Sequence, residues 1–212
     1  ADLESMDVGG NTALMLAADR GHADVVTCLL KSRADVRPTN NRDESAWSLA
    51  LEGCHVKVLQ ILAQQWKNPQ EYLTTELRNA AATKTPRVVS ALLKAQANVN
   101  ACDKTFGGTP LTSAVRHLKQ DYCLPMIRLL LQYKADIEGR TRFGDTALLY
   151  AAEKNNVDAF CALLDAGADL KVSDNEGRTV LMRLATHGNS DVIKQILSSD
   201  RYFISQKALQ EE

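Results

Sequence analysis

The residue types that most often perform chemistry in proteins are present in this chain, but they are not arranged for catalysis or metal binding. Four histidines and five cysteines include no Cys-x-x-Cys pair, and they never combine with carboxylates at the spacing of metal ligands. His117 and His187 have no serine nucleophile motif beside them. Gly107 and Gly108 precede a Thr-Pro pair typical of a helix start, so they do not indicate a phosphate-binding loop. We therefore expect no enzymatic activity, no metal and no cofactor.

The cysteines are better explained as reduced thiols with structural roles. An odd count of five, without metal-ligand spacing, is typical of proteins in a reducing intracellular compartment. Cys28 and Cys161 lie in aliphatic helical segments, where we expect them to be small core residues. Cys54 stands between two helical segments and Cys102 in a turn. With no signal-like start, the sequence predicts a cytoplasmic or nuclear protein.

The overall composition is that of a chain with ample core and no bias toward a charged partner. Of its 212 residues 45% are hydrophobic, and the formal net charge is -1. A general nucleic-acid binder usually has a basic excess, so nucleic acid is not expected as a partner. No apolar run approaches the roughly 18 residues that a membrane span requires, so we expect no membrane insertion.

The elements that must position any functional residue recur along the chain. A threonine followed two positions later by leucine occurs at Thr12, Thr109, Thr146 and Thr179, and each time an aliphatic segment comes next. Thr12 to Ser45 is 33 residues, and Thr146 to Thr179 is again 33 residues. Threonine is a favoured first residue of a helix, because its hydroxyl accepts a hydrogen bond from an otherwise unpaired amide. A period of this length, with two short helices per unit, indicates a solenoid.

The repeat resembles the ankyrin family, and the resemblance covers almost the whole chain. The segment Asp174-Asn-Glu-Gly-Arg-Thr-Val-Leu181 is close to the family's Asp-x-x-Gly-x-Thr-Pro-Leu pattern. Closing motifs of alanine, aspartate or asparagine, and an aliphatic residue follow at Ala34, Ala97, Ala135 and Ala168. The resemblance implies an all-α fold, an ankyrin-repeat solenoid of stacked helix pairs with β-turn fingers and about six repeats.

The register of the motifs divides the chain into repeats of a single domain, residues 1–212. We expect repeats at about 7–39, 40–69, 70–102, 103–139, 140–172 and 173–205, anchored by the four threonines, Ser45 and Thr75. Residues 1–6 align with the tail of a preceding repeat, so we expect the chain to derive from a longer protein. Residues 198–212 are expected to form a C-terminal cap, in which Tyr202, Phe203 and Ile204 fold back on the last helix pair.

Two stretches depart from the regular repeat. Between residues 64 and 75 the closing motif is missing, which predicts a helix that opens at Pro69 without a finger before it. A decayed repeat with a local bend is favoured here over a notch shaped for a ligand. Within residues 116–125 there are four extra residues, and Pro125 suits the first turn of the second helix. An extended first helix and a neutral insertion are both favoured over a binding loop there.

Three closing turns lack the glycine that the family has at this point. Arg33, Gln96 and Lys134 stand in its place. The turn requires a left-handed backbone, which should cost about 1 kcal/mol at each residue that is not glycine. The array is therefore expected to be less stable than an idealised one.

The resemblance also implies where a partner would bind, namely on the finger tips and on the exposed positions of the first helix in each repeat. Phe106 and Phe143 fall at matching tips, three residues before Thr109 and Thr146, and exposed aromatic residues often anchor interfaces. In the fourth to sixth repeats, five basic residues face three acidic ones. The predicted partner-binding residues are Phe106, Arg116, His117, Arg142, Phe143, Tyr150, Glu153, Lys154, Arg178 and Arg183.

The sequence thus favours a monomeric, non-enzymatic module that binds a protein or peptide with an acidic segment, as the scaffold or adaptor part of a larger protein. One alternative is a regulatory ankyrin segment of a larger multidomain enzyme or channel, acting in cis. Another is a structural spacer without a specific ligand, against which the aromatic residues at the predicted contact positions argue.

Overall fold

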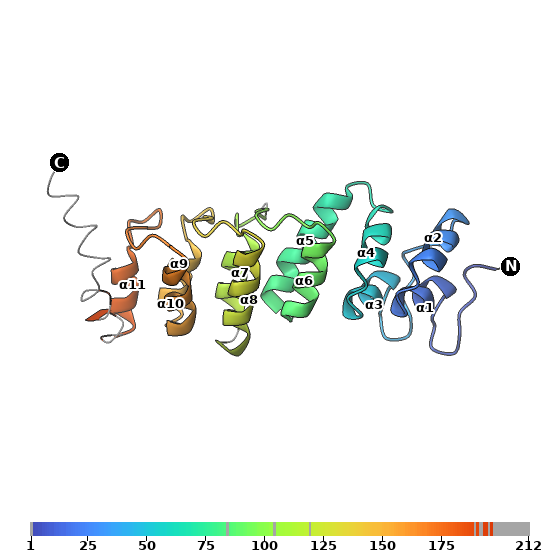
Figure 1. Cartoon of the computed structure of the whole chain (residues 1–212), viewed down its shortest axis with the longest axis horizontal. Coiled ribbons are helices and arrows are strands. Elements are labelled where there is room, and N and C mark those ends of the chain that lie inside the picture. The colour runs from blue at the N-terminus through green and yellow to red at the C-terminus, as the bar shows by residue number, and fades with distance from the viewer. Residues whose placement is uncertain are drawn as a thin grey trace. The chain divides into compact units, whose positions relative to one another are not determined.

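The computed structural model describes residues 2–83, 85–103, 105–118, 120–188, 190, 193, 194 and 196. This part of the chain is helical, and outside the helices it has two isolated β-bridges, which confirms the all-α prediction (Figure 1). The helices are α1 Ala13–Asp19, α2 Ala23–Lys31, α3 Ala46–Glu52, α4 Val56–Ala63, α5 Pro69–Thr83, α6 Pro86–Lys94, α7 Pro110–His117, α8 Gln120–Gln132, α9 Ala147–Glu153, α10 Val157–Asp165 and α11 Val180–Thr186. The predicted cap at Tyr202, Phe203 and Ile204 lies outside the described residues.

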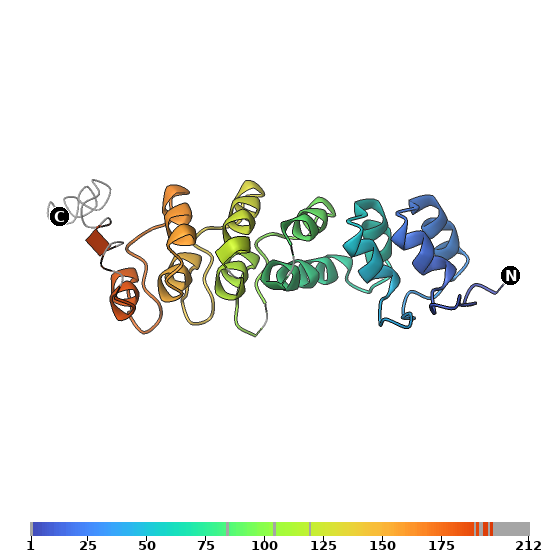
Figure 2. The ribbon, with the colours of Figure 1, turned by 90° about the horizontal axis from the view of Figure 1, so that it is seen from below.

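The chain forms two compact units. The N-terminal unit comprises Ala1–Ala80 with Lys84–Val99, and the C-terminal unit comprises Ala81–Thr83 with Asn100–Glu212. Within each unit the helices pair and the pairs stack in two layers (Figure 2). In the N-terminal unit α1 packs on α3, and α2 on α4. In the C-terminal unit α7 packs on α9 and α9 on α11, while α8 packs on α10.

Hydroxyl side chains begin the first helix of five repeats, as the sequence predicts. The hydroxyl of Thr12 accepts a hydrogen bond from the amide of Met15, and that of Thr146 accepts one from the amide of Leu149. Ser45, Thr109 and Thr179 cap their helices in the same way. Alanine pairs such as Ala151 and Ala152, both fully buried, let the helices approach closely. Local capping and small core residues therefore define the repeat.

The fingers are held by side chains at their own first position. The side-chain oxygen of Asn40 accepts hydrogen bonds from the amides of Arg42 and Glu44, and that of Asp174 accepts from Glu176 and Arg178. Asp7, Asp103 and Thr141 act likewise in the other fingers. Successive fingers are joined by backbone hydrogen bonds, including one from the Arg142 amide to the Phe106 carbonyl at 2.8 Å. The finger tips are consequently well fixed.

The first helix of the third repeat begins where Pro69 predicts it. As expected, α5 opens at Pro69, and only residues 64–68 separate it from α4, which leaves no room for a finger. Thr75, which anchors this repeat in the sequence register, lies inside α5, where its hydroxyl donates to the Glu71 carbonyl at 2.9 Å. Trp47, Trp66 and Tyr72 form an aromatic cluster here, with the Trp66 and Tyr72 rings stacked at 4.1 Å between centroids.

The four extra residues of the fourth repeat lengthen its second helix. α7 ends at His117, and α8 already begins at Gln120, so Pro125 lies inside α8 rather than in its first turn. The expected extension of the first helix is therefore wrong. Beyond the first turn, a proline lacks the N–H for the hydrogen bond to the carbonyl four residues earlier, and its ring crowds that carbonyl, so Pro125 destabilises α8 near its start.

The cysteines differ in burial from what their helical positions predict. Cys28 is exposed, and Cys161 is only half-buried, so the prediction of two core residues is wrong for Cys28. Cys123 on α8 is the buried thiol, and burial raises its pKa to about 11. Such a thiol stays protonated and unreactive at neutral pH. An aliphatic neighbourhood in sequence did not distinguish the inner from the outer face of a short helix.

The strained closing turns are confirmed. Arg33, Gln96 and Lys134 have φ angles of 71°, 73° and 62°, while Gly167 holds the corresponding place in the fifth repeat at 97°. Replacing Arg33 by glycine should raise the free energy of unfolding by up to about 1 kcal/mol, because a glycine adopts this conformation without steric cost. Urea denaturation of the variant would measure this gain.

The neighbouring Ser32 provides a control for the Arg33→Gly variant. Ser32 is also exposed but has a φ of -82°, so a glycine there relieves nothing. Ser32→Gly should lower the free energy of unfolding by about 0.5–1 kcal/mol. Equal effects of the two glycines would contradict the assignment of strain to Arg33.

Candidate functional site

Two phenylalanines stand at the tips of successive fingers in the C-terminal unit. The Asp103 carboxylate accepts hydrogen bonds from the amides of Thr105, Phe106 and Gly108 at 2.6–2.8 Å and so fixes the first tip. Phe106 is 48% exposed and Phe143 is 55% exposed. Their ring centroids are 6.4 Å apart, so the rings contact each other and still present apolar surface to solvent. Contiguous apolar surface that is exposed to solvent often marks a binding site.

Arg116 lies beside these rings. Its Cζ atom is 5.7 Å from the centroid of Phe106 and 5.6 Å from that of Tyr150, so the guanidinium interacts with an aromatic ring on α9 and with one on a finger. Tyr150, which the sequence predicts as an apolar anchor, is only 6% exposed. Burial and the nearby Asp145 carboxylate raise its pKa. The structure thus places Tyr150 beneath Arg116 rather than at the surface.

Arg183, one of the predicted partner-binding residues, is buried. Its guanidinium pairs with Asp145, with Glu153 at 2.5 Å and with Asp174 at 2.6 Å. Burial disfavours the charged form of Asp174, but hydrogen bonds from Arg183 and Arg178 outweigh that effect and hold its pKa well below the usual range. Arg183 therefore ties two fingers to α9 and α11 and has no free edge for a partner.

Pairing removes most of the acidic charge from the predicted site. Arg178 is paired with Asp174 at 2.7 Å and with Glu176 at 3.4 Å, and Glu153 belongs to Arg183. In the described part of the C-terminal unit, Arg116, Arg142 and Lys154 are exposed without an ion pair. His117 is exposed beside them, and its pKa is lowered by partial burial and by the charges of Arg116 and Lys154.

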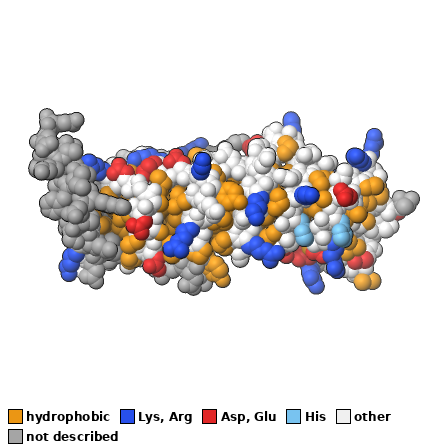
Figure 3. Space-filling view, in the orientation of Figure 1, with side chains coloured by type: hydrophobic (Ala, Val, Ile, Leu, Met, Phe, Trp, Pro, Cys, Tyr) orange, Lys and Arg blue, Asp and Glu red, His pale blue; other side chains and the backbone are white. Residues whose placement is uncertain are grey.

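Simple charge counting does not reveal this surface. On the face drawn in Figure 3, side chains of both signs lie among hydrophobic ones over both units. The distinguishing property is the combination of two exposed aromatic rings with cations that have no carboxylate partner among the described residues. We refer to Phe106, Phe143, Arg116, His117, Arg142 and Lys154 as the aromatic–basic surface.

Sequence reasoning missed the part played by Asp174. A usable signal exists, because Asp174 begins the Asp-x-x-Gly finger pattern, and such a residue faces into its own finger. Tyr150 and Arg183 also share one position, four residues after the threonine caps of α9 and α11. Burial at this position depends on the neighbouring repeat, so a single repeat does not reveal it.

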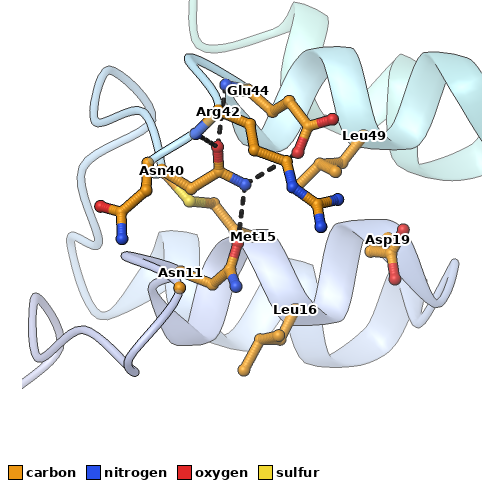
Figure 4. A pocket seen from close by; sticks show the side chains of 10 residues that line it. Asn11, Met15, Leu16, Asp19, Asn40, Arg42, Glu44 and Leu49 are labelled. Carbon is orange, nitrogen blue, oxygen red and sulfur yellow. Dashed lines mark hydrogen bonds between the residues drawn. The ribbon is translucent and has the colours of Figure 1, made fainter.

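The N-terminal unit has a pocket between its first two fingers and the helices α1 and α3 (Figure 4). It encloses about 290 Å³ and has an apolar side formed by Met15, Leu16 and Leu49. Asn40 holds the opposite side by donating hydrogen bonds to Asn11 and Glu44, both at 2.9 Å. The remaining lining residues are Gly9, Asp19, Asn41 and Arg42. Two acidic groups and one basic group give it no dominant charge.

The described residues offer no group of three or more histidine, cysteine or carboxylate side chains that could hold a metal ion. Within the same residues, every helix is too short or too polar to cross a membrane. The exposed aromatic and basic groups are suited to binding.

Comparisons with known proteins agree with the repeat architecture. A family model described as ankyrin repeats (3 copies) matches residues 1–72, 77–174 and 122–208. The chain is 31% identical over 175 residues to neurogenic locus notch homolog protein 1 of Xenopus tropicalis, covering 82% of this chain and 6% of that protein. It is 32% identical over 145 residues to ankyrin repeat and SOCS box protein 6 of Mus musculus, covering 66% of this chain and 33% of that protein.

The structure is also similar to a solved one. The crystal structure of the ankyrin repeat domain of Bcl-3, described as a member of the IkappaB family, matches with a TM-score of 0.61 and 25% identity, covering 86% of this chain and 81% of that chain. Helix pairs, capped fingers and the family model lead to one conclusion: the chain belongs to the ankyrin-repeat family, whose fold is a protein–protein interaction module.

Proposed function

We propose that this chain binds a protein or peptide segment on the aromatic–basic surface of its C-terminal unit. The observation that supports this best is the exposed pair Phe106 and Phe143, set among cations that have no carboxylate partner. Aromatic residues and arginine are the residues that most often dominate binding energy at interfaces. Glu153 and Arg178 are half-exposed and already have ion pairs, so we expect them to contribute less to binding than the unpaired cations.

The partner should contain an acidic segment. Three unpaired cations, Arg116, Arg142 and Lys154, attract negative charge, and none of them must first give up an internal ion pair. We place the chain in an intracellular scaffold or adaptor protein, consistent with five cysteines that remain free thiols.

Replacing both phenylalanines by alanine should abolish tight binding. The loss of one buried aromatic anchor costs roughly 2 kcal/mol, about thirty-fold in affinity, and the double variant should lose more. Affinity capture identifies the partner, and a titration of the purified pair then measures the loss. Circular dichroism checks that the Phe106→Ala/Phe143→Ala variant remains folded.

Tyr122 on α8 offers a matched control for this experiment. Tyr122 is 53% exposed, which is close to the exposure of the two phenylalanines. It lies on the second helix of its repeat and not on a finger. Tyr122→Ala should leave the affinity within about two-fold, since isolated surface contacts contribute little. Unchanged affinity in the double phenylalanine variant would place the binding site elsewhere.

A regulatory role in cis is the second candidate function. It is favoured by the length of the relatives, since the chain spans 6% of the notch homolog and 33% of the SOCS box protein. In that case the acidic segment belongs to the same polypeptide. Adding this chain as a separate fragment to the longer protein should then compete with the internal contact, and Phe106→Ala/Phe143→Ala should weaken the competition.

A further inference from the structure

Among the cations of the aromatic–basic surface, Arg116 is the one that the structure holds in place. Its Cζ atom lies over the rings of Phe106 and Tyr150 at 5.7 and 5.6 Å. Tyr150 is buried within α9, and Phe106 is fixed by the Asp103 carboxylate and by a backbone hydrogen bond from Arg142. A long flexible side chain is thereby restricted before any partner arrives, which reduces the entropy lost on binding.

The hydrogen-bonding capacity of Arg116 remains unused. In the described part of the chain its side chain has no ion pair and no hydrogen bond, although it is exposed. Interactions with aromatic rings use the charge of a guanidinium and leave its N–H groups available. The carboxylates of Asp145 and Glu153 pair with Arg183 instead of Arg116.

We propose that Arg116 is the anion receptor of this surface, and that it takes a carboxylate or phosphate on a side chain of the bound protein segment. Guanidinium matches both groups, because two parallel N–H donors can reach two oxygens at once. The same segment places an apolar side chain on Phe106 and Phe143, whose exposed rings adjoin the receptor. Partial burial and the charges of Arg116 and Lys154 lower the pKa of His117, so Lys154 lies close enough to add positive charge on the same side. The identity of the partner as a protein segment rests on the proposed function, whereas the assignment of Arg116 as an anion receptor does not.

The receptor can be tested on the free protein with simple anions. The Arg116 Nε–H resonance is followed by nuclear magnetic resonance while inorganic phosphate or acetate is added, with sodium chloride at equal ionic strength as reference. We expect a saturable shift at Arg116 with phosphate and acetate and none with chloride. Arg128 on α8 is the internal control, since it is an exposed arginine on another helix of the same repeat. Equal shifts at Arg116 and Arg128, or no shift at Arg116, would overturn the proposal.

The nature of the bound segment is tested with a library of random peptides displayed on phage and selected on the protein. We expect selected peptides to share an acidic residue next to an apolar one. For a synthetic peptide of this kind, glutamate to glutamine should weaken binding to the wild type about ten- to hundred-fold. The same change should have little effect on binding to Arg116→Gln, because the two groups act as a pair. Arg128→Gln should behave as the wild type.

The outcomes separate the receptor from the proposed function. If the glutamate-to-glutamine change in the peptide weakens binding to Arg116→Gln as much as binding to the wild type, Arg116 is not the receptor, even though peptides bind. If no peptide is selected while the Arg116 resonance responds to anions, the proposed function fails and the receptor stands. Peptides that carry phosphoserine in place of the glutamate identify the source of the anion. Tighter binding assigns a phosphorylated partner, and weaker binding assigns a carboxylate.

Discussion

Replacing Arg183 by methionine should lower the free energy of unfolding of the C-terminal unit by about 3–5 kcal/mol. Methionine fills much of the space but leaves the carboxylates of Asp145 and Asp174 buried without their main counter-charge. The side chain of Asp174 is 1% exposed and that of Asp145 is 9% exposed, so water cannot replace the lost partner. Urea denaturation followed by far-ultraviolet circular dichroism measures the change.

Arg178 provides the matched control, because it pairs with the same Asp174 carboxylate from the surface. Its side chain is 51% exposed, and exposed ion pairs contribute about 0–1 kcal/mol. Arg178→Met should therefore have a small effect. Similar losses in the two methionine variants would mean that burial of the Arg183 cluster does not govern the stability of this unit.

The second large effect is expected in the N-terminal unit, where Trp47→Ala should cost about 3–5 kcal/mol. Trp47 is 5% exposed and meets both other rings of the aromatic cluster edge-on, with centroids 4.8 Å from Tyr72 and 5.7 Å from Trp66. Without the indole, these rings lose a contact surface that no nearby side chain can fill. The fluorescence of Trp66 reports unfolding of this unit directly, since both tryptophans belong to it.

The Trp47→Phe variant shows how much of the stability lost in Trp47→Ala is due to the missing aromatic ring. The Nε1 atom of Trp47 is buried and has no hydrogen-bond partner among the described residues, so removing the N–H loses no bond. Phenylalanine keeps one aromatic ring but fills less space than indole, so we expect a loss of stability smaller than that of alanine. A phenylalanine variant as unstable as the alanine variant would contradict this, and would show that a single ring cannot replace any of the packing of the indole.

The fold was accessible from sequence because its signals are local. Thr146 caps the helix that directly follows it, and the left-handed turn at Lys134 lies where a closing glycine is missing. Thr75 differs from the other anchors, because its hydroxyl donates to the Glu71 carbonyl within a helix and does not cap a helix start. Pro69 was the stronger signal, since proline is favoured at the first position of a helix.

The binding surface was only partly accessible in this way. The tips of Phe106 and Phe143 follow from the repeat register, and both rings are exposed. The burial of Arg183 depends on carboxylates 30 and 38 residues away in sequence, so no local pattern could reveal it. Distant pairing determines which charges of the predicted site remain free for a partner, and a local sequence pattern does not show this.

The separation of the two phenylalanine rings has a consequence for the spacing of residues in any segment that touches both. The ring centroids are 6.4 Å apart, and the two fingers that hold them are joined through their backbones. An extended chain advances about 3.3 Å per residue, so its matching side chains must be two positions apart, on one side of the strand. On a helix, side chains about 5–6 Å apart lie three or four positions apart. The finger pair thus acts as a ruler, and the interval between apolar residues in a bound segment reports whether that segment binds as a strand or as a helix.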